Sequence, residues 1–181
     1  MKMNTPNKLT ILRVMMIPFF VVCMLVPFGN GVNKWVALAI FVLASLTDWL
    51  DGYLARRDNL VTDFGKFMDP LADKMLVGAA MICMVALGTL PAWIVIVIIS
   101  REFIISGFRL IAADNGIVIA ASWWGKIKTA TQMIMIIVVI ADLGGVFGII
   151  GQVLIYASLV FTVISLVDYL IKNKKVLNMQ E

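Results

Sequence analysis

Six long apolar segments constrain this chain more than any other feature of its sequence. Each is close to the length of about 20 residues that a helix needs to cross the hydrocarbon of a bilayer. Hydrophobic residues make up 62% of the chain and the mean hydropathy is +1.00, which exceeds the values of soluble domains. The segments lie near Ile11–Phe28, Lys34–Ala55, Phe64–Leu87, Pro91–Ala112, Trp123–Asp142 and Phe147–Ile171. We therefore predict an all-α polytopic membrane protein with six transmembrane helices, forming a single membrane-embedded domain over residues 1–181.

The basic residues predict the orientation of these helices. With the N-terminus in the cytoplasm, 14 of the 15 Lys and Arg residues fall on or near the cytoplasmic side, and only Lys34 falls outside. Such an excess marks the cytoplasmic face of a membrane protein. We expect both termini in the cytoplasm, with residues 1–10 as a short interfacial segment and residues 172–181 as a tail. Pro6 and Asn7 in the first of these could start a helix that continues into the first span. The protein would belong to the cytoplasmic (inner) membrane, and its net charge of +4 would reflect topology rather than binding to nucleic acid.

Four aspartates stand at the cytoplasmic ends of the second and third segments. Asp48 and Asp51 are spaced i,i+3, and Asp69 and Asp73 are spaced i,i+4, so each pair lies on one helical face. The pairs lie at similar distances before and after a turn near Leu60, so antiparallel helices would bring them to matching depths in a cavity open to the cytoplasm. An ionised Asp near a bilayer centre costs roughly 2.5–3.5 kcal/mol. Hard cations such as Mg²⁺ or Mn²⁺ prefer oxygen ligands, and two such ions would balance the charge of four carboxylates. We therefore predict a divalent-metal site, and we expect the metal to serve chemistry on phosphates.

Small residues lie beside the acids. Gly52 and Ala55 on one segment and Gly65 on the facing one leave space where a flat or bulky group could approach the backbone. Arg56 is adjacent to that space and could bind a phosphate in a bidentate manner. The alternative is that the small residues only allow close packing of helices.

A second group of charges follows the acids along the chain. Arg101 and Glu102 interrupt an apolar run, so we expect them to face a polar cavity or each other; the alternative role is a structural pair that orients helices. Arg109 lies on roughly the same face as Arg101, and Lys126 and Lys128 come near the cytoplasmic end of the next segment. The two lysines could be simple cytoplasmic anchors. Clustered beside a metal site, these cations would instead suit a dianionic substrate.

The spacing of the acids and small residues matches a known family. The pattern D-x2-D-G-x2-A-R-x8-G-x3-D-x3-D is met at every fixed position, by Asp48, Asp51, Gly52, Ala55, Arg56, Gly65, Asp69 and Asp73. It resembles the signature of the CDP-alcohol phosphotransferases. The resemblance implies a metal-dependent transferase and a homodimer, with two divalent ions bound by the four aspartates. It also implies that Asp73 is the base, and that the Gly, Ala and Arg positions receive the CDP moiety.

Three further segments resemble the members of that family whose acceptor is glycerol 3-phosphate. They are residues 6–13 (PNKLTILR), 101–109 (REFIISGFR) and 124–129 (WGKIKT). The resemblance implies that the phosphatidyl group of CDP-diacylglycerol is transferred to the hydroxyl of sn-glycerol 3-phosphate, giving phosphatidylglycerophosphate and CMP in phosphatidylglycerol biosynthesis. Asn7, Thr10 and Arg13 are then expected to help hold the nucleotide or lipid phosphate; the alternative roles are helix capping and interfacial snorkelling. The four cations Arg101, Arg109, Lys126 and Lys128 are expected to bind the acceptor.

Two other functions remain open at this stage. The same chemistry could serve another acceptor, such as serine, inositol or a lipid, although clustered cations argue against a neutral or zwitterionic one. A cation transporter could also use acids within the membrane. Polar residues should then continue to the far side, whereas the outer half of this chain is nearly all apolar, which disfavours transport.

Overall fold

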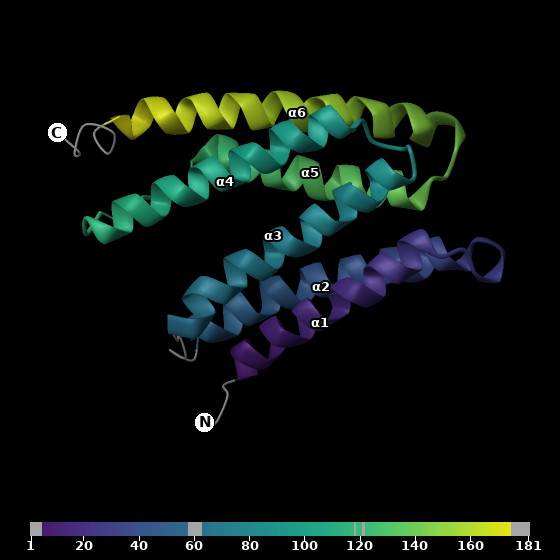
Figure 1. The fold of residues 1–181 in the computed structure, drawn as a ribbon, viewed down its shortest axis with the longest axis horizontal. Coiled ribbons are helices and arrows are strands. Elements are labelled where there is room, and N and C mark those ends of the chain that lie inside the picture. The colour runs from purple at the N-terminus through teal and green to yellow at the C-terminus, as the bar shows by residue number, and fades with distance from the viewer. Residues whose placement is uncertain (1–4, 58–62, 118, 121, 175–181) are drawn as a thin grey trace. The chain divides into compact units, whose positions relative to one another are not determined.

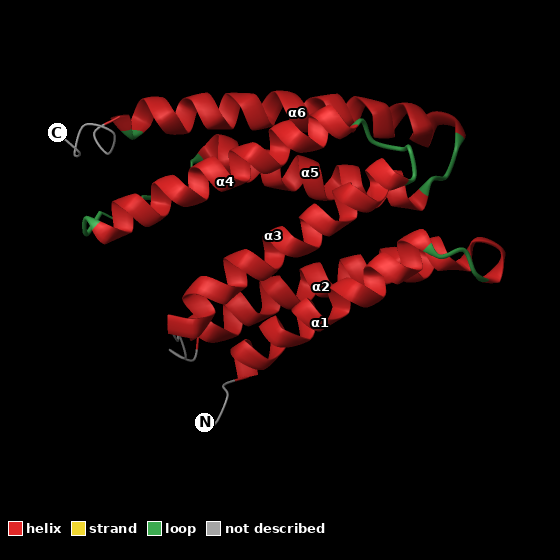
Figure 2. Cartoon of the chain, in the orientation of Figure 1, coloured by secondary structure: helices red, strands yellow, loops and turns green. Residues whose placement is uncertain are grey.

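The computed structural model describes residues 5–57, 63–117, 119–120 and 122–174 (Figure 1). These residues form α-helices, one short 3-10 helix and loops, and contain no strand (Figure 2), which confirms the predicted all-α class for the described part of the chain. In chain order the elements are α1 (Thr5–Leu25), η1 (Gly29–Gly31), α2 (Val32–Arg57), α3 (Asp63–Ala86), α4 (Ala92–Asp114), α5 (Trp123–Ala141) and α6 (Gly145–Lys172).

The helix boundaries follow the breakers in the sequence. The bounds of α2 to α6 lie within two residues of the apolar segments predicted above. The turn between α5 and α6 places Asp142 and Gly144 at φ 42° and 69°, in the left-handed region that favours glycine. α1 begins at Thr5 and runs without a break through residues 5–10 into the first apolar segment, as expected for a helix that starts near Pro6 and Asn7. Pro6 is compatible with this early start because proline is tolerated in the first turn of a helix.

The first compact unit, Met1–Thr89, contains α1, α2 and α3. α1 packs against both α2 and α3, which also contact each other. The rings of Phe20 and Phe41 meet with their centroids 6.0 Å apart. Ala37 and Ala44, seven residues apart on α2, are fully buried. Small residues at helical spacing let neighbouring helices approach closely, so this unit is held together along the α1 face of α2.

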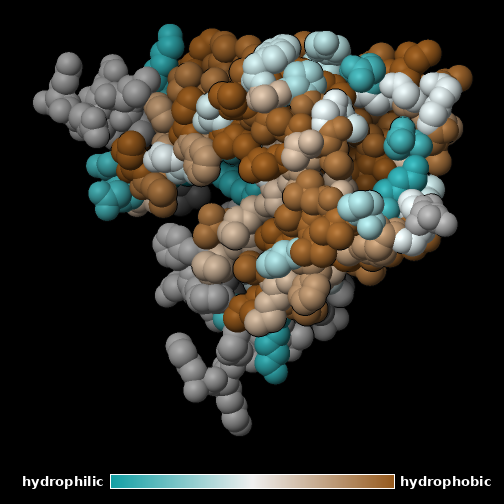
Figure 3. All heavy atoms as spheres, turned by 45° about the vertical axis from the view of Figure 1, so that its right-hand side comes forward, coloured by the Kyte–Doolittle hydropathy of each residue, from teal (hydrophilic) through white to brown (hydrophobic). Residues whose placement is uncertain are grey.

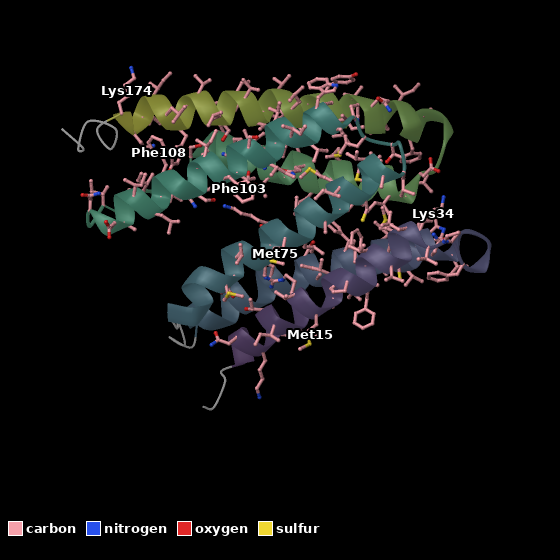
Figure 4. The ribbon with its side chains drawn as sticks, in the orientation of Figure 1. Met15, Lys34, Met75, Phe103, Phe108 and Lys174 are labelled. Atoms are coloured by element: carbon pink, nitrogen blue, oxygen red, sulfur yellow. The ribbon has the colours of Figure 1, made fainter. Side chains whose placement is uncertain are left out.

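The second compact unit, Leu90–Glu181, contains α4, α5 and α6. α6 packs against both α4 and α5. Phe108, labelled in Figure 4, meets Tyr169 edge to face with ring centroids 6.3 Å apart. Trp124 on α5 stacks on Phe161 of α6 at a similar distance, 6.3 Å. These contacts hold α4 and α5 against α6.

Large apolar side chains cover the outer surfaces of both units. Met15 on α1 and Phe103 on α4 are examples (Figure 4), and hydrophobic residues occupy most of the face drawn in Figure 3. Apolar surface of this extent requires a partner other than water, and a bilayer supplies it. Among the described residues, three helical segments are long and apolar enough to cross a membrane: Asn7–Leu25, Trp123–Ala141 and Gly145–Lys172. The chain therefore has the character of a membrane protein.

Candidate functional site

A buried polar face on α1 is the first element of the site. Asn7, Thr10 and Arg13 recur every three residues along a largely apolar helix, so they share one side of it. All three are buried, Thr10 and Arg13 completely. A fully buried arginine is costly unless its charge is paired and its donors are satisfied. The residues to which this face bonds therefore indicate which groups α1 positions.

Arg13 is paired with the first aspartate of the motif. Its Nη1 donates to Oδ1 of Asp48 on α2 at 2.7 Å, and its Nε donates to the backbone oxygen of Ala44 at 3.2 Å. The side chain of Arg13 is 0% exposed, whereas that of Asp48 is 38% exposed. Arg13 thus approaches from inside the unit and leaves part of the carboxylate accessible from outside.

Thr10 is bonded to the third aspartate of the motif. Its hydroxyl donates to Oδ1 of Asp69 on α3. Asp48 lies within electrostatic reach of Asp69, so α2 and α3 bring these two acids near each other. Asp73 is half-buried one turn further along α3. α1 therefore packs behind the acids and bonds to two of them, a role that the sequence did not predict for it.

Several predicted site residues lie outside the described side chains. The backbones of Asp51, Gly52, Ala55 and Arg56 are helical in α2, and that of Gly65 is helical in α3. Nothing is described of their side-chain contacts. Among the side chains that are described, no group of three or more acids, histidines or cysteines could hold a metal ion.

The described acids nevertheless fit a hard divalent cation in chemical type. Asp48 and Asp69 supply carboxylate oxygens, which Mg²⁺ and Mn²⁺ prefer. Each also accepts a hydrogen bond from α1, through Arg13 and Thr10 respectively. Donors of this kind commonly orient the carboxylates that bind a metal. The acids of α2 and α3, with α1 behind them, are therefore the candidate metal site of the first unit.

A cluster of buried charges is the second element of the site. Arg101 on α4 and Lys128 on α5 both bond to Oε1 of Glu102, at 2.8 and 2.6 Å. Their side chains are only 9% and 4% exposed. The other terminal nitrogen of Arg101 donates to the hydroxyl of Ser165 on α6. The cluster thus joins all three helices of the second unit.

The start of α5 brings Lys128 to this cluster. Ser122 caps the helix by accepting a hydrogen bond from the backbone N–H of Gly125 at 3.1 Å, which is a typical start of a helix. A Cβ atom on Gly125 would lie 3.5 Å from Nη2 of Arg101, so the backbone of α5 passes close to the guanidinium group. Lys128 follows one turn later, and its side chain reaches Glu102.

The four cations predicted to act together differ in burial. Glu102 brings Arg101 and Lys128 together, whereas Arg109 and Lys126 are exposed. The predicted Arg101–Glu102 pair is confirmed. Exposure of Lys126 fits the alternative role of a membrane anchor, but burial of Lys128 contradicts that role, because an anchor keeps its charge in water.

Ser165 and the bridging position of Glu102 are the features that sequence reasoning missed in this unit. A sequence signal for Ser165 exists, since Ser158, Thr162 and Ser165 recur at helical spacing in an apolar segment, and all three are fully buried. The sequence gives no such signal for the bridging role of Glu102, because Glu102 and its partner Lys128 are 26 residues apart in the chain.

Comparison with known proteins gives consistent matches. The family model described as CDP-alcohol phosphatidyltransferase matches residues 3–164. The chain is 51% identical over 143 residues to a CDP-diacylglycerol--glycerol-3-phosphate 3-phosphatidyltransferase of Bacillus subtilis, with 74% of each chain covered. It is 41% identical over 177 residues to a protein of the same name from Haemophilus influenzae, covering 94% of this chain and 93% of the relative. A probable phosphatidylglycerophosphate synthase of Mycobacterium tuberculosis is 41% identical, over 92% of this chain and 79% of the relative.

Proposed function

The chain belongs to the CDP-alcohol phosphatidyltransferase family, and we propose that it transfers the phosphatidyl group of CDP-diacylglycerol to sn-glycerol 3-phosphate. The products are phosphatidylglycerophosphate and CMP, in the biosynthesis of phosphatidylglycerol. The observation that carries this proposal is the identity of 41–51% to relatives named for this reaction. The family match begins at residue 3 and ends at residue 164, so it supports assigning both compact units to one catalytic domain.

We assign the donor half of the reaction to the first unit. Asp48, Asp51, Asp69 and Asp73 are the proposed ligands of two divalent ions, Mg²⁺ or Mn²⁺. When bound, such ions would supply positive charge that stabilises the negative charge of the diphosphate and of the departing CMP. The bonds from Thr10 and Arg13 to Asp69 and Asp48 support this assignment, because they hold the two carboxylates before any ligand arrives.

The remaining donor contacts come from the same unit. The space beside Gly52, Ala55 and Gly65 receives the CDP moiety, and Arg56 contacts its phosphate. Asn7, Thr10 and Arg13 complete this binding region, and Thr10 and Arg13, which are fully buried, act on it through the aspartates that they bond. The acyl chains of the donor extend into the surrounding bilayer while its headgroup stays at the aspartates.

The reaction is a displacement at phosphorus. The primary hydroxyl of glycerol 3-phosphate forms an O–P bond with the lipid-bearing phosphorus, and the bond from that phosphorus to the CMP oxygen breaks. Asp73 accepts the hydroxyl proton as general base. Positioning and charge stabilisation suffice for such a transfer, so no covalent enzyme intermediate is required.

We assign the acceptor half to the cations of the second unit. Arg101 and Lys128 are the central pair, because both are buried beside Glu102 and can attract a phosphate without competition from bulk water. Arg109 and Lys126, which are exposed, are proposed to guide the acceptor from solvent. A phosphate monoester suits this arrangement, whereas serine and inositol lack the dianionic group.

The membrane topology belongs to the same proposal. The six α-helices of the described residues are each at least 19 residues long. At about 1.5 Å per residue, each can span a bilayer of about 30 Å, which would have to thin slightly around the shortest helix. We propose six spans, both termini in the cytoplasm, and an active site that faces the cytoplasm of the inner membrane. We also propose that the protein works as a homodimer, by likeness to its family.

Release of CMP tests the proposed function. Purified protein in detergent micelles is given CDP-diacylglycerol and Mg²⁺ or Mn²⁺, with glycerol 3-phosphate, serine or inositol offered separately. We expect turnover only with glycerol 3-phosphate. Turnover with serine or inositol instead would keep the chemistry and overturn the acceptor assignment. No CMP with any acceptor, from folded protein, would refute the transferase proposal.

A further inference from the structure

The hydroxyl of Ser165 bonds to a buried arginine of another helix. Nη2 of Arg101 on α4 donates to Oγ of Ser165 on α6. Ser165 is fully buried and Arg101 is almost fully buried. A hydrogen bond is electrostatically stronger in such surroundings than in water, and a charged donor strengthens it further. The bond therefore ties the guanidinium group of Arg101 to α6.

Ser165 differs from two other buried hydroxyl residues on the same face of α6. Ser158, Thr162 and Ser165 recur at helical spacing, and all three are fully buried. The hydroxyl of Thr162 donates within the helix, to the backbone oxygen of Ser158. Within the described part of the chain, the hydroxyl of Ser158 has no hydrogen-bond partner. Ser165 instead bonds across to α4, which is more than the packing of α6 requires of a small polar residue.

The backbone of α5 passes beside this bond. A Cβ atom on Gly125 would lie 3.5 Å from Nη2 of Arg101 and 3.6 Å from Oγ of Ser165. Both are ordinary contact distances, so α5 lies against the two atoms that form the bond. The bond between Arg101 and Ser165 is thus located where the three helices of the second unit meet, and α5 restricts the space into which the guanidinium group could turn.

Bonds at both terminal nitrogens fix the plane of the guanidinium group. Nη1 of Arg101 bonds to Oε1 of Glu102 at 2.8 Å, and Nη2 bonds to Ser165. The group is planar and its donors form a rigid fork, so one bond alone would leave the plane able to turn about that bond. Among the described residues, Nε of Arg101 has no hydrogen-bond partner. Arg101 is therefore held in one orientation while a donor is left over.

We infer that Ser165 is a positioning residue that orients Arg101 for the phosphate of the acceptor, an inference that rests on the proposed function and deepens it by adding α6 to the acceptor site. A guanidinium group recognises a phosphate through N–H donors aligned with its oxygens, so the angle of its plane decides how well it binds. Ser165 sets that angle without contacting the substrate. The role depends on orientation and not on the net charge of the neighbouring groups.

Steady-state kinetics of Ser165→Ala test the inference. Alanine keeps the small size of the side chain but removes the hydroxyl. We expect the KM for glycerol 3-phosphate to rise about fivefold, which is less than for direct loss of a bond to a charged group, because Arg101 keeps its bond to Glu102. The kcat and the KM for CDP-diacylglycerol should change by less than about twofold.

Ser158→Ala is the matched control. It is the same substitution on the same face of α6, at a serine that is also fully buried but whose hydroxyl has no partner among the described residues. Both KM values should stay within about twofold of the unaltered protein. If Ser165→Ala does not fold, Ser165→Cys replaces it: the thiol is similar in size but accepts hydrogen bonds weakly, and we expect about a threefold rise in the acceptor KM.

Three results would overturn the inference. The first is an unchanged or lower acceptor KM in Ser165→Ala, or in Ser165→Cys if that variant is used, which would mean that Arg101 does not depend on α6. The second is an equal rise in the KM of both substrates, and the third is an equal rise in the acceptor KM of Ser158→Ala; both would indicate a general role in helix packing. Any of these results with full activity of the unaltered protein leaves the proposed function intact. Absence of turnover by the unaltered protein refutes the proposed function itself.

Discussion

Replacing Arg13 with methionine should destabilise the first unit measurably. Methionine keeps much of the side-chain volume but removes the bond to Oδ1 of Asp48 and the bond to the Ala44 carbonyl. Breaking one partner of a fully buried ion pair costs about 3–5 kcal/mol. Asp48 is 38% exposed, so water can solvate it after the change, and we expect a smaller loss of about 2 kcal/mol.

Thermal unfolding in detergent measures this loss. For a chain of this length, 1 kcal/mol corresponds to a shift in Tm of about 2–4 °C, so Arg13→Met should lower Tm by about 4–8 °C in EDTA. The matched control is Lys8→Met, which removes an exposed cation from the same helix and should leave Tm within about 1 °C. In the double variant with Asp48→Asn the losses should be less than additive, because both changes break one interaction.

Three results would refute this reasoning. Arg13→Met could leave Tm unchanged in EDTA, which would mean that the pair contributes nothing to stability. Lys8→Met could lower Tm equally, which would point to a general effect of charge on α1. The losses from Arg13→Met and Asp48→Asn could add fully, which would mean that the two residues act independently.

Three further predictions concern activity. Asp69→Asn should reduce CMP release by at least about 100-fold, since it removes a proposed metal ligand; substantial residual activity would contradict the assignment. Thr10→Val, which removes the hydroxyl that donates to Asp69, should weaken Mn²⁺ binding by about tenfold or more, as measured by titration of the protein without donor; an unchanged affinity would argue against positioning from α1. Lys128→Met should raise the KM for glycerol 3-phosphate about tenfold or more, whereas Lys126→Met, at an exposed position, should raise it by less than about threefold. Equal effects of the two substitutions would contradict the different roles assigned to the two lysines.

The helices could be predicted from sequence because their signals are local. Apolar runs of spanning length, separated by Gly- and Pro-containing breakers, place α2 to α6 within two residues of their observed bounds. The i,i+3 and i,i+4 spacing of the aspartates likewise identifies shared helical faces without knowledge of tertiary structure. The early start of α1 is also a local signal, because Pro6 lies in the first turn, where proline is tolerated.

The contacts that organise the site could not be predicted in the same way. The bond from Thr10 to Asp69 joins residues 59 apart, and the pair of Arg13 and Asp48 joins residues 35 apart. Such contacts depend on how α1 is rotated against α2 and α3, and sequence spacing does not determine that rotation. Likewise, Lys126 and Lys128 are equivalent in charge and near neighbours in sequence, and only packing shows that one is exposed and the other buried.

Incorporation of labelled glycerol 3-phosphate into lipid tests the central claim most directly. Purified protein in micelles with CDP-diacylglycerol and Mg²⁺ should transfer the label to the organic extract as phosphatidylglycerophosphate, with one CMP released per lipid formed. EDTA and Asp69→Asn should each abolish the transfer. Release of CMP without labelled lipid, or label transfer that persists in EDTA and in Asp69→Asn, would contradict the account.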